Sequence, residues 1–159
     1  MYDFTLDASD KPTLYRDLAS ALEGLIVGEP DPIANMANAA ALIFETVPGL
    51  NWAGFYRAID GELVLGPFQG RAACIRIPFG TGVCGAAAAT LQVQRVDDVH
   101  AFPGHIACDA ASVSELVVPI IGRDENSSPS STSTAPPRRA SMLRMRRGLW
   151  QLRPYCRRG

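Results

Sequence analysis

The 159-residue sequence lacks several features that would place it in a membrane or around a metal. It has no apolar run long enough to span a bilayer, and its acidic start, MYDFTLDASDK, has no hydrophobic signal-peptide core. We therefore expect a cytoplasmic protein that does not bind membranes. No CxxC or HxxxH spacing accompanies His100 and His105, so we expect no metal site. The turn at 80–82, GTG, is too short to cradle a phosphate.

Basic residues are scarce in the first part of the chain, and acidic residues are scarce in the last. Residues 1–122 carry 6 Lys and Arg against 14 Asp and Glu, a net charge of −8. Residues 123–159 carry 9 basic and 2 acidic residues, a net charge of +7, in a Ser/Pro/Arg-rich composition. This break predicts a globular domain over 1–121 and a disordered tail over 122–159.

The first part of the chain predicts an α+β domain. Leucines at helical spacing indicate a helix over 13–27, and Asp31 followed by a proline starts a second helix well. The alternation from Asn51 and the turn at Asp60-Gly61 predict a hairpin that returns through 62–65. Further strands are expected at 74–77, 93–96 and 115–121, and an Ala-rich helix at 83–91. Two leading helices and an antiparallel sheet define the class.

Three cysteines, Cys74, Cys84 and Cys108, lie within 35 residues of each other. Thiols stay reduced in the cytoplasm, so this grouping favours redox or metal chemistry over a structural disulfide framework. The alternative is that all three are packed core thiols, because unpaired cysteines are commonly buried.

Five segments carry a resemblance to a known family: NWAGFY (51–56), LVLGPFQG (63–70), AACIRIPFGTGVCG (72–85), QRVDDVHAFPGHIACDAAS (94–112) and SELVVPI (114–120). Over residues 12–121 the chain resembles the free methionine-(R)-sulfoxide reductases, a GAF-domain family. The resemblance implies a GAF-like antiparallel sheet with flanking helices. It also implies reduction of free methionine-R-sulfoxide, with thioredoxin regenerating the enzyme. A homodimer is one assembly that the chain could form, and no nucleic acid partner is expected.

The chemistry needs one attacking thiolate and one resolving thiol, and it uses neither a metal nor an organic cofactor. By resemblance, Cys108 in HIACD attacks the sulfoxide and Cys74 in AACIRIP resolves the sulfenic acid. Cys84 in GVCG is the third family cysteine and an alternative resolving thiol, since a helix start could lower its pKa.

A small zwitterionic substrate also needs polar and aromatic groups. The family uses Glu115 in its substrate pocket, where a carboxyl could bind or protonate the sulfoxide oxygen. Trp52 and Tyr56 each lie two residues from Gly54 on the same strand face, and together they fit an aromatic wall for the methyl group. The alternative is that both aromatics belong to the core of the sheet.

The end of the chain departs from the family. Members continue with a strand carrying an LDID-like acidic pair, expected to hold the substrate ammonium, and then with a C-terminal helix. Reading the tail codons from the third base onward permits LDID, Ser-Pro and an acidic helix. We therefore interpret the tail from about 122 as a frameshift product that lacks the last central strand and the terminal helix. Loss of that central strand would expose residues 115–121 as a sheet edge and impair activity. A natural basic tail that binds nucleic acid or anionic membrane is the alternative.

A rival function remains at this point. A non-catalytic GAF ligand-binding or redox-sensing module would use the same cysteines. A protein with either function would form a disulfide when it is oxidised, but only the reductase turns over methionine sulfoxide with thioredoxin.

Overall fold

The computed structural model describes residues 10–102, 112–122 and 140–148, and within them the predicted α+β class is confirmed. The helices and strands of these ranges are α1 (Lys11–Ile26), α2 (Pro32–Thr46), β1 (Leu50–Ile59), β2 (Glu62–Gly70), β3 (Arg76–Pro78), α3 (Gly82–Thr90), β4 (Gln94–Val96), the 3₁₀ turn η1 (Val99–Ala101), β5 (Ser112–Ile121) and β6 (Ala140–Gly148).

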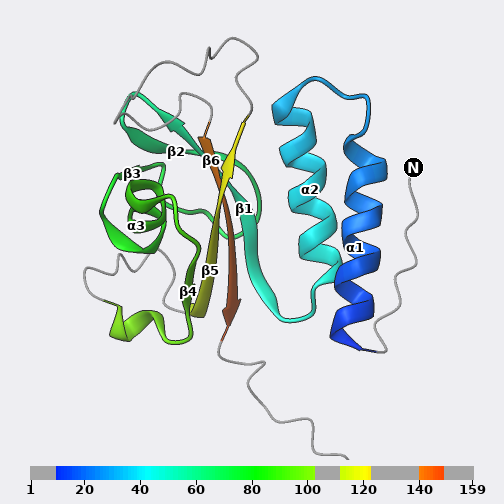
Figure 1. Cartoon of the computed structure of the whole chain (residues 1–159). Helices are drawn as coiled ribbons and strands as arrows, with labels where there is room; N and C mark the ends of the chain where they lie inside the picture. Colours follow the sequence, from blue (N-terminus) through cyan, green and yellow to red (C-terminus); the bar gives the residue numbers. More distant parts are fainter. Residues whose placement is uncertain (1–9, 103–111, 123–139, 149–159) are drawn as a thin grey trace, which may run out of the picture.

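The described strands form one antiparallel sheet in the order β3-β2-β1-β6-β5-β4. Helices α1 and α2 cover one face of this sheet, and α3 lies against the other (Figure 1). Side chains of β1 alternate between the two layers. Trp52 and Tyr56 pack toward α3, whereas Ala53 and Phe55 pack toward α1 and α2. The sheet therefore separates two cores.

Both leading helices are present, and α1 begins at Lys11, two residues before the predicted start at residue 13. Asp10 caps α1 by accepting a hydrogen bond from the Thr13 amide at 2.9 Å. Asp31 caps α2 by accepting from the amides of Ile33 and Ala34, so the predicted start is confirmed. Each cap satisfies amides that have no partner within the helix.

The predicted hairpin is also confirmed. Asp60 and Gly61 have φ angles of +50° and +84° between β1 and β2, as a tight turn with left-handed backbone at both central residues requires. The third strand begins later than predicted, at Arg76. The carbonyls of Arg71 and Cys74 accept hydrogen bonds from side chains of β1, so residues 71–74 do not join a regular ladder. Cys74 therefore precedes the strand on which it was expected.

The largest correction concerns the tail. We predicted that the last central strand is missing and that 122–159 is disordered, but residues 140–148 form β6 between β1 and β5. The prediction of an exposed edge at 115–121 is wrong for the same reason, because β5 pairs with β4 on one side and β6 on the other. Residues 123–139 and 149–159, where a terminal helix would fall, lie outside the described residues.

Packing explains why this part of the tail joins the sheet. Leu143 and Met145 lie two residues apart, and both pack against the cluster formed by Leu42, Ile43 and Ala53 on the α2 face. Central strands need apolar side chains at alternate positions, and this short segment provides two. The alternation of Leu143 and Met145 with arginines is the sequence signal that predicts the strand.

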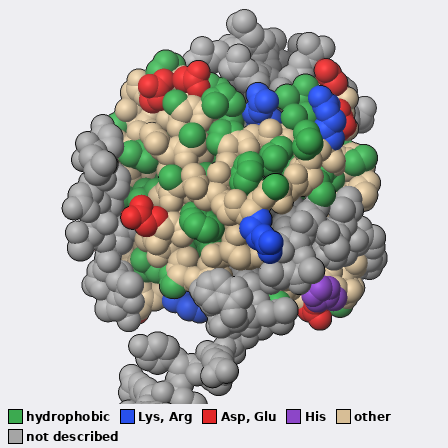
Figure 2. Space-filling view, turned by 180° about the vertical axis from the view of Figure 1, so that it is seen from behind, with side chains coloured by type: hydrophobic (Ala, Val, Ile, Leu, Met, Phe, Trp, Pro, Cys, Tyr) green, Lys and Arg blue, Asp and Glu red, His purple; other side chains and the backbone are tan. Residues whose placement is uncertain are grey.

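On the face of the molecule seen from behind, the lysine and arginine side chains of the described residues lie apart from one another and form no single basic patch (Figure 2). None of the helices in the described ranges is long and apolar enough to cross a membrane. An apolar cavity of about 860 Å³ lies between α1, α2 and the sheet, and none of the predicted site residues lines it.

Candidate active site

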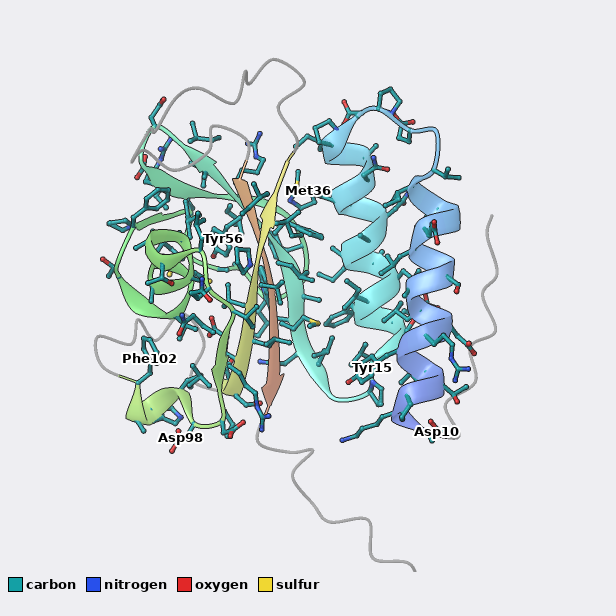
Figure 3. All side chains as sticks on the ribbon, in the orientation of Figure 1. Asp10, Tyr15, Met36, Tyr56, Asp98 and Phe102 are labelled. Carbon is teal, nitrogen blue, oxygen red and sulfur yellow. The ribbon has the colours of Figure 1, made fainter. Side chains whose placement is uncertain are left out.

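Four of the predicted site residues meet on the α3 side of the sheet. Trp52 and Tyr56 come from β1, Glu115 from β5 and Cys84 from the first turn of α3. All four are buried, with exposed fractions of 3% or less. Tyr56 lies between the sheet and α3, as Figure 3 shows. Three elements distant in the sequence thus place these side chains in one core.

The two aromatic residues form a stack. The Trp52 ring lies 5.5 Å from the Phe68 ring and 6.1 Å from the Tyr56 ring, centroid to centroid, with nearly parallel planes. Both polar groups of the pair donate to the backbone of the next segment. Trp52 Nε1 donates to the Arg71 carbonyl at 3.1 Å, and the Tyr56 hydroxyl donates to the Cys74 carbonyl at 2.9 Å. Both aromatics are therefore core residues that also fix the backbone around Cys74.

The described cysteines differ in state. Cys74 is disulfide-bonded, with its partner outside the described residues. Cys84 is a reduced thiol with an exposed fraction of 2%, and its Sγ lies 3.6 Å from Oε1 of Glu115. A thiol is a weak donor and a carboxylate is an acceptor, so this contact satisfies part of a buried acidic group. The two cysteines therefore have different surroundings on the same side of the sheet.

The predicted nucleophile Cys108 and His105 lie outside the described residues. The backbone of His100 donates to Asp98 in the short turn η1, which makes Asp98 a cap residue. Across the described ranges, no group of three or more His, Cys, Asp and Glu side chains could hold a metal ion.

Sequence reasoning missed one polar contact beside the site. Asn51 Nδ2 donates to Oγ of Ser112 at 3.0 Å, and Ser112 is 1% exposed. Asn51 opens the NWAGFY segment and Ser112 closes the segment that contains Cys108. This bond ties the end of the cysteine loop to the start of β1. Position at the ends of two shared motifs is the signal that points to the pair.

Tyr56→Phe tests whether the hydroxyl fixes the cysteine segment. We expect the free energy of unfolding to fall by about 1–2 kcal/mol, because the partly buried Cys74 carbonyl loses its donor while the ring stays in place. Urea denaturation measures the change. Tyr15→Phe is the matched control, since Tyr15 is 44% exposed on α1 and its change should stay within about 0.5 kcal/mol. Equal effects of the two substitutions would contradict the assignment.

This chain is similar in sequence and in structure to known proteins. No family model matches the chain. The chain is 53% identical over 116 residues to the free methionine-R-sulfoxide reductase of Escherichia coli, covering 73% of this chain and 70% of that protein. It is 57% identical over 122 residues to the protein YtsP of Bacillus subtilis, covering 76% and 75%. A solved structure of free methionine-R-sulfoxide reductase from Neisseria meningitidis in complex with its substrate is 41% identical and has a TM-score of 0.79, covering 92% of this chain and 81% of that one.

A solved structure of a GAF domain is 36% identical to this chain and has a TM-score of 0.76, covering 91% of this chain and 78% of that one. Together with the antiparallel sheet between helices, this similarity defines a GAF-fold protein. Among GAF-fold proteins, the identity to curated relatives decides the family. The chain belongs to the free methionine-R-sulfoxide reductases, which are oxidoreductases acting on sulfur. The resemblance noted from the sequence is thereby confirmed.

Proposed function

We propose that this chain reduces free methionine-R-sulfoxide to methionine with electrons from thioredoxin. The observation that carries the proposal is the contrast between the two described cysteines in a chain of this family. Cys74 is disulfide-bonded and precedes a strand, whereas Cys84 is buried in the core as a thiol. This contrast supports Cys74, rather than Cys84, as the resolving thiol.

The proposed reaction has three balanced steps. The Cys108 thiolate attacks the sulfoxide sulfur and forms an S–S bond, while the sulfoxide oxygen takes up a proton. That oxygen then passes to the Cys108 sulfur as the S–O and S–S bonds to the substrate break, so methionine leaves and Cys108 becomes a sulfenic acid. The Cys74 thiol then attacks that sulfenic sulfur, which releases water and forms the Cys74–Cys108 disulfide. A thioredoxin dithiol reduces this disulfide and is itself oxidised. Both cysteines end as thiols, ready for another substrate.

Glu115 is the proposed partner of the sulfoxide oxygen. Its carboxyl is 3% exposed on β5, facing the same core as Trp52 and Tyr56. We place this carboxyl where it binds or protonates the sulfoxide oxygen as the S–O bond breaks. In the proposed pocket, Trp52 and Tyr56 supply the apolar side for the methyl group. Their polar atoms at the same time hold the segment of Cys74 by hydrogen bonds.

A coupled assay with thioredoxin, thioredoxin reductase and NADPH tests the function. NADPH should be consumed with free methionine-R-sulfoxide, and much less with the S epimer. Oxidation of Cys74 without NADPH consumption would instead favour a redox-sensing GAF module. A reductase working this way needs a compartment that keeps thioredoxin reduced, which fits the cytoplasm.

We also propose that the tail lowers the activity of this chain. Strand β6 runs between the two strands of the site, and Arg146 is the register partner of both Trp52 and Glu115. An arginine at that position does not supply the carboxylates that a substrate ammonium requires. Each missing charge-assisted hydrogen bond costs about tenfold or more in affinity.

Sequencing the gene across codons 118–128 tests this explanation of the tail. One inserted or missing base should restore the Leu-Asp-Ile-Asp strand. The restored protein should then show a KM at least about tenfold lower than the 159-residue chain. An intact reading frame together with an equal KM would contradict the frameshift.

A further inference from the structure

The proposed reaction leaves Cys84 without a role. This thiol is nevertheless surrounded by the residues of the site, in the core cluster that contains Trp52, Tyr56 and Val117. Its Sγ lies 3.6 Å from Oε1 of Glu115, a contact between residues 31 positions apart in the sequence. Both side chains are nearly fully buried, so bulk water competes little for this contact.

The backbone that carries Cys84 is held tightly. The first turn of α3 is closed on the preceding turn by hydrogen bonds from the Gly80 amide to the Gly85 carbonyl and from the Gly85 amide to the Thr81 carbonyl. A Cβ on Gly85 would lie 2.5 Å from the Pro78 carbonyl oxygen, so the helix start and this turn are in close contact. The backbone that carries Cys84 is therefore fixed against the end of β3.

A cysteine side chain suits both the apolar and the polar contacts of this position. A cysteine behaves as a small apolar residue toward the cluster of Val83, Ala87 and Val117, yet its S–H can donate to an acceptor. A bond to one oxygen of Glu115 restricts rotation of the carboxyl group. The second oxygen is then presented in a fixed direction, which matters if that group acts on the sulfoxide.

We propose that Cys84 is a positioning residue that orients Glu115 through its thiol, and that it takes no part in disulfide exchange. This inference rests on the proposed function, because it assigns Glu115 to the sulfoxide oxygen. It differs from the two readings that the sequence left open, a resolving thiol and a passive core residue. Each of the three predicts a different pattern of variants.

Cys84→Ala and Cys84→Ser separate the readings in the full chain. If the thiol orients Glu115, alanine should lower kcat about tenfold and change KM less than about threefold, and serine should recover most of that loss as a donor. A passive core residue predicts the reverse order, since a buried hydroxyl without a role costs more than a methyl group. A resolving thiol predicts that both variants make one equivalent of methionine and then stop with thioredoxin present.

Val83→Ala is the matched control, because it removes apolar volume from the same cluster beside Cys84. It should lower stability while leaving kcat within about twofold of the parent. A fall in kcat as large as that of Cys84→Ala would overturn the proposal, because loosened packing would then explain both.

A double-mutant cycle distinguishes failure of this inference from failure of the proposed function. Urea unfolding of Cys84→Ala, Glu115→Gln and the double variant measures the contact whether or not the chain turns over substrate. We expect non-additivity by a factor of roughly five or more in the unfolding equilibrium constant. Additive effects would overturn the contact itself, whereas absence of turnover with a clear coupling would reject only the reductase assignment.

Discussion

Cys108→Ser is expected to abolish turnover of free methionine-R-sulfoxide, with a loss of about 10³-fold or more. A serine hydroxyl stays protonated at neutral pH and cannot accept the oxygen as a sulfenic acid, so neither of the first two steps can occur. The measurement is NADPH consumption with thioredoxin, made on the 159-residue chain and on the chain with its frame restored. Undiminished turnover in Cys108→Ser would reject the assignment of the nucleophile.

Cys74→Ser should give a different defect and thereby separates the two thiol roles. The first step remains intact, so each chain should form about one methionine and then stop as a sulfenic acid that a dimedone-type reagent can label. Cys156→Ser is the control, because Cys156 lies beyond the residues matched by the family motifs. It should turn over like the parent. Continued turnover of Cys74→Ser would require another resolving thiol.

Most of the fold could be predicted because local signals and packing agree in the first part of the chain. Asp31 caps α2, and the Asp60-Gly61 turn connects two alternating strands as the sequence indicates. The start of β3 could not be read in this way. It depends on hydrogen bonds from Trp52 and Tyr56 to carbonyls about 20 residues away. No local sequence pattern predicts hydrogen bonds over that separation.

Strand β6 was missed for the opposite reason, since the composition of its surroundings conceals a short local signal. Serines, prolines and arginines around it favour disorder when averaged over a window. Two alternating apolar residues, Leu143 and Met145, were enough because β1 and β5 leave a central position between them. The free energy that stabilises β6 in that position comes from the whole sheet and not from the sequence of the segment itself.

The candidate site was predicted as a set of residues but not as a geometry. The sequence motifs singled out Trp52, Glu115 and Cys84, and the structure buries all three side chains in one core. That Cys84 contacts Glu115, and that Tyr56 holds the backbone of Cys74, depends on how β1, β5 and α3 pack. Such contacts require the three-dimensional structure.

Gly54 lies between the two aromatics of the site on β1, and its lack of a side chain makes their packing possible. A Cβ added there would lie 2.3 Å from Cβ of Phe68, 2.7 Å from its Cα and 2.8 Å from Cη2 of Trp52. Two of these three atoms belong to or adjoin the backbone of β2, which pairs with Gly54 directly. Trp52 is also held, by its stack on Phe68 and its bond to Arg71. No neighbour can therefore move aside cheaply.

Gly54→Ala is accordingly expected to lower the free energy of unfolding by about 3 kcal/mol, the upper end of what overpacking of a core typically costs. Gly24→Ala is the matched control, because Gly24 lies within α1 with nothing within 4 Å of the added Cβ. It should stabilise the chain by up to about 1 kcal/mol through helix propensity. Urea denaturation of the two variants thus tests opposite signs for the same chemical change. A Gly54→Ala protein as stable as the parent would show that β1 and β2 can separate locally, and that Trp52 is less fixed than its contacts imply.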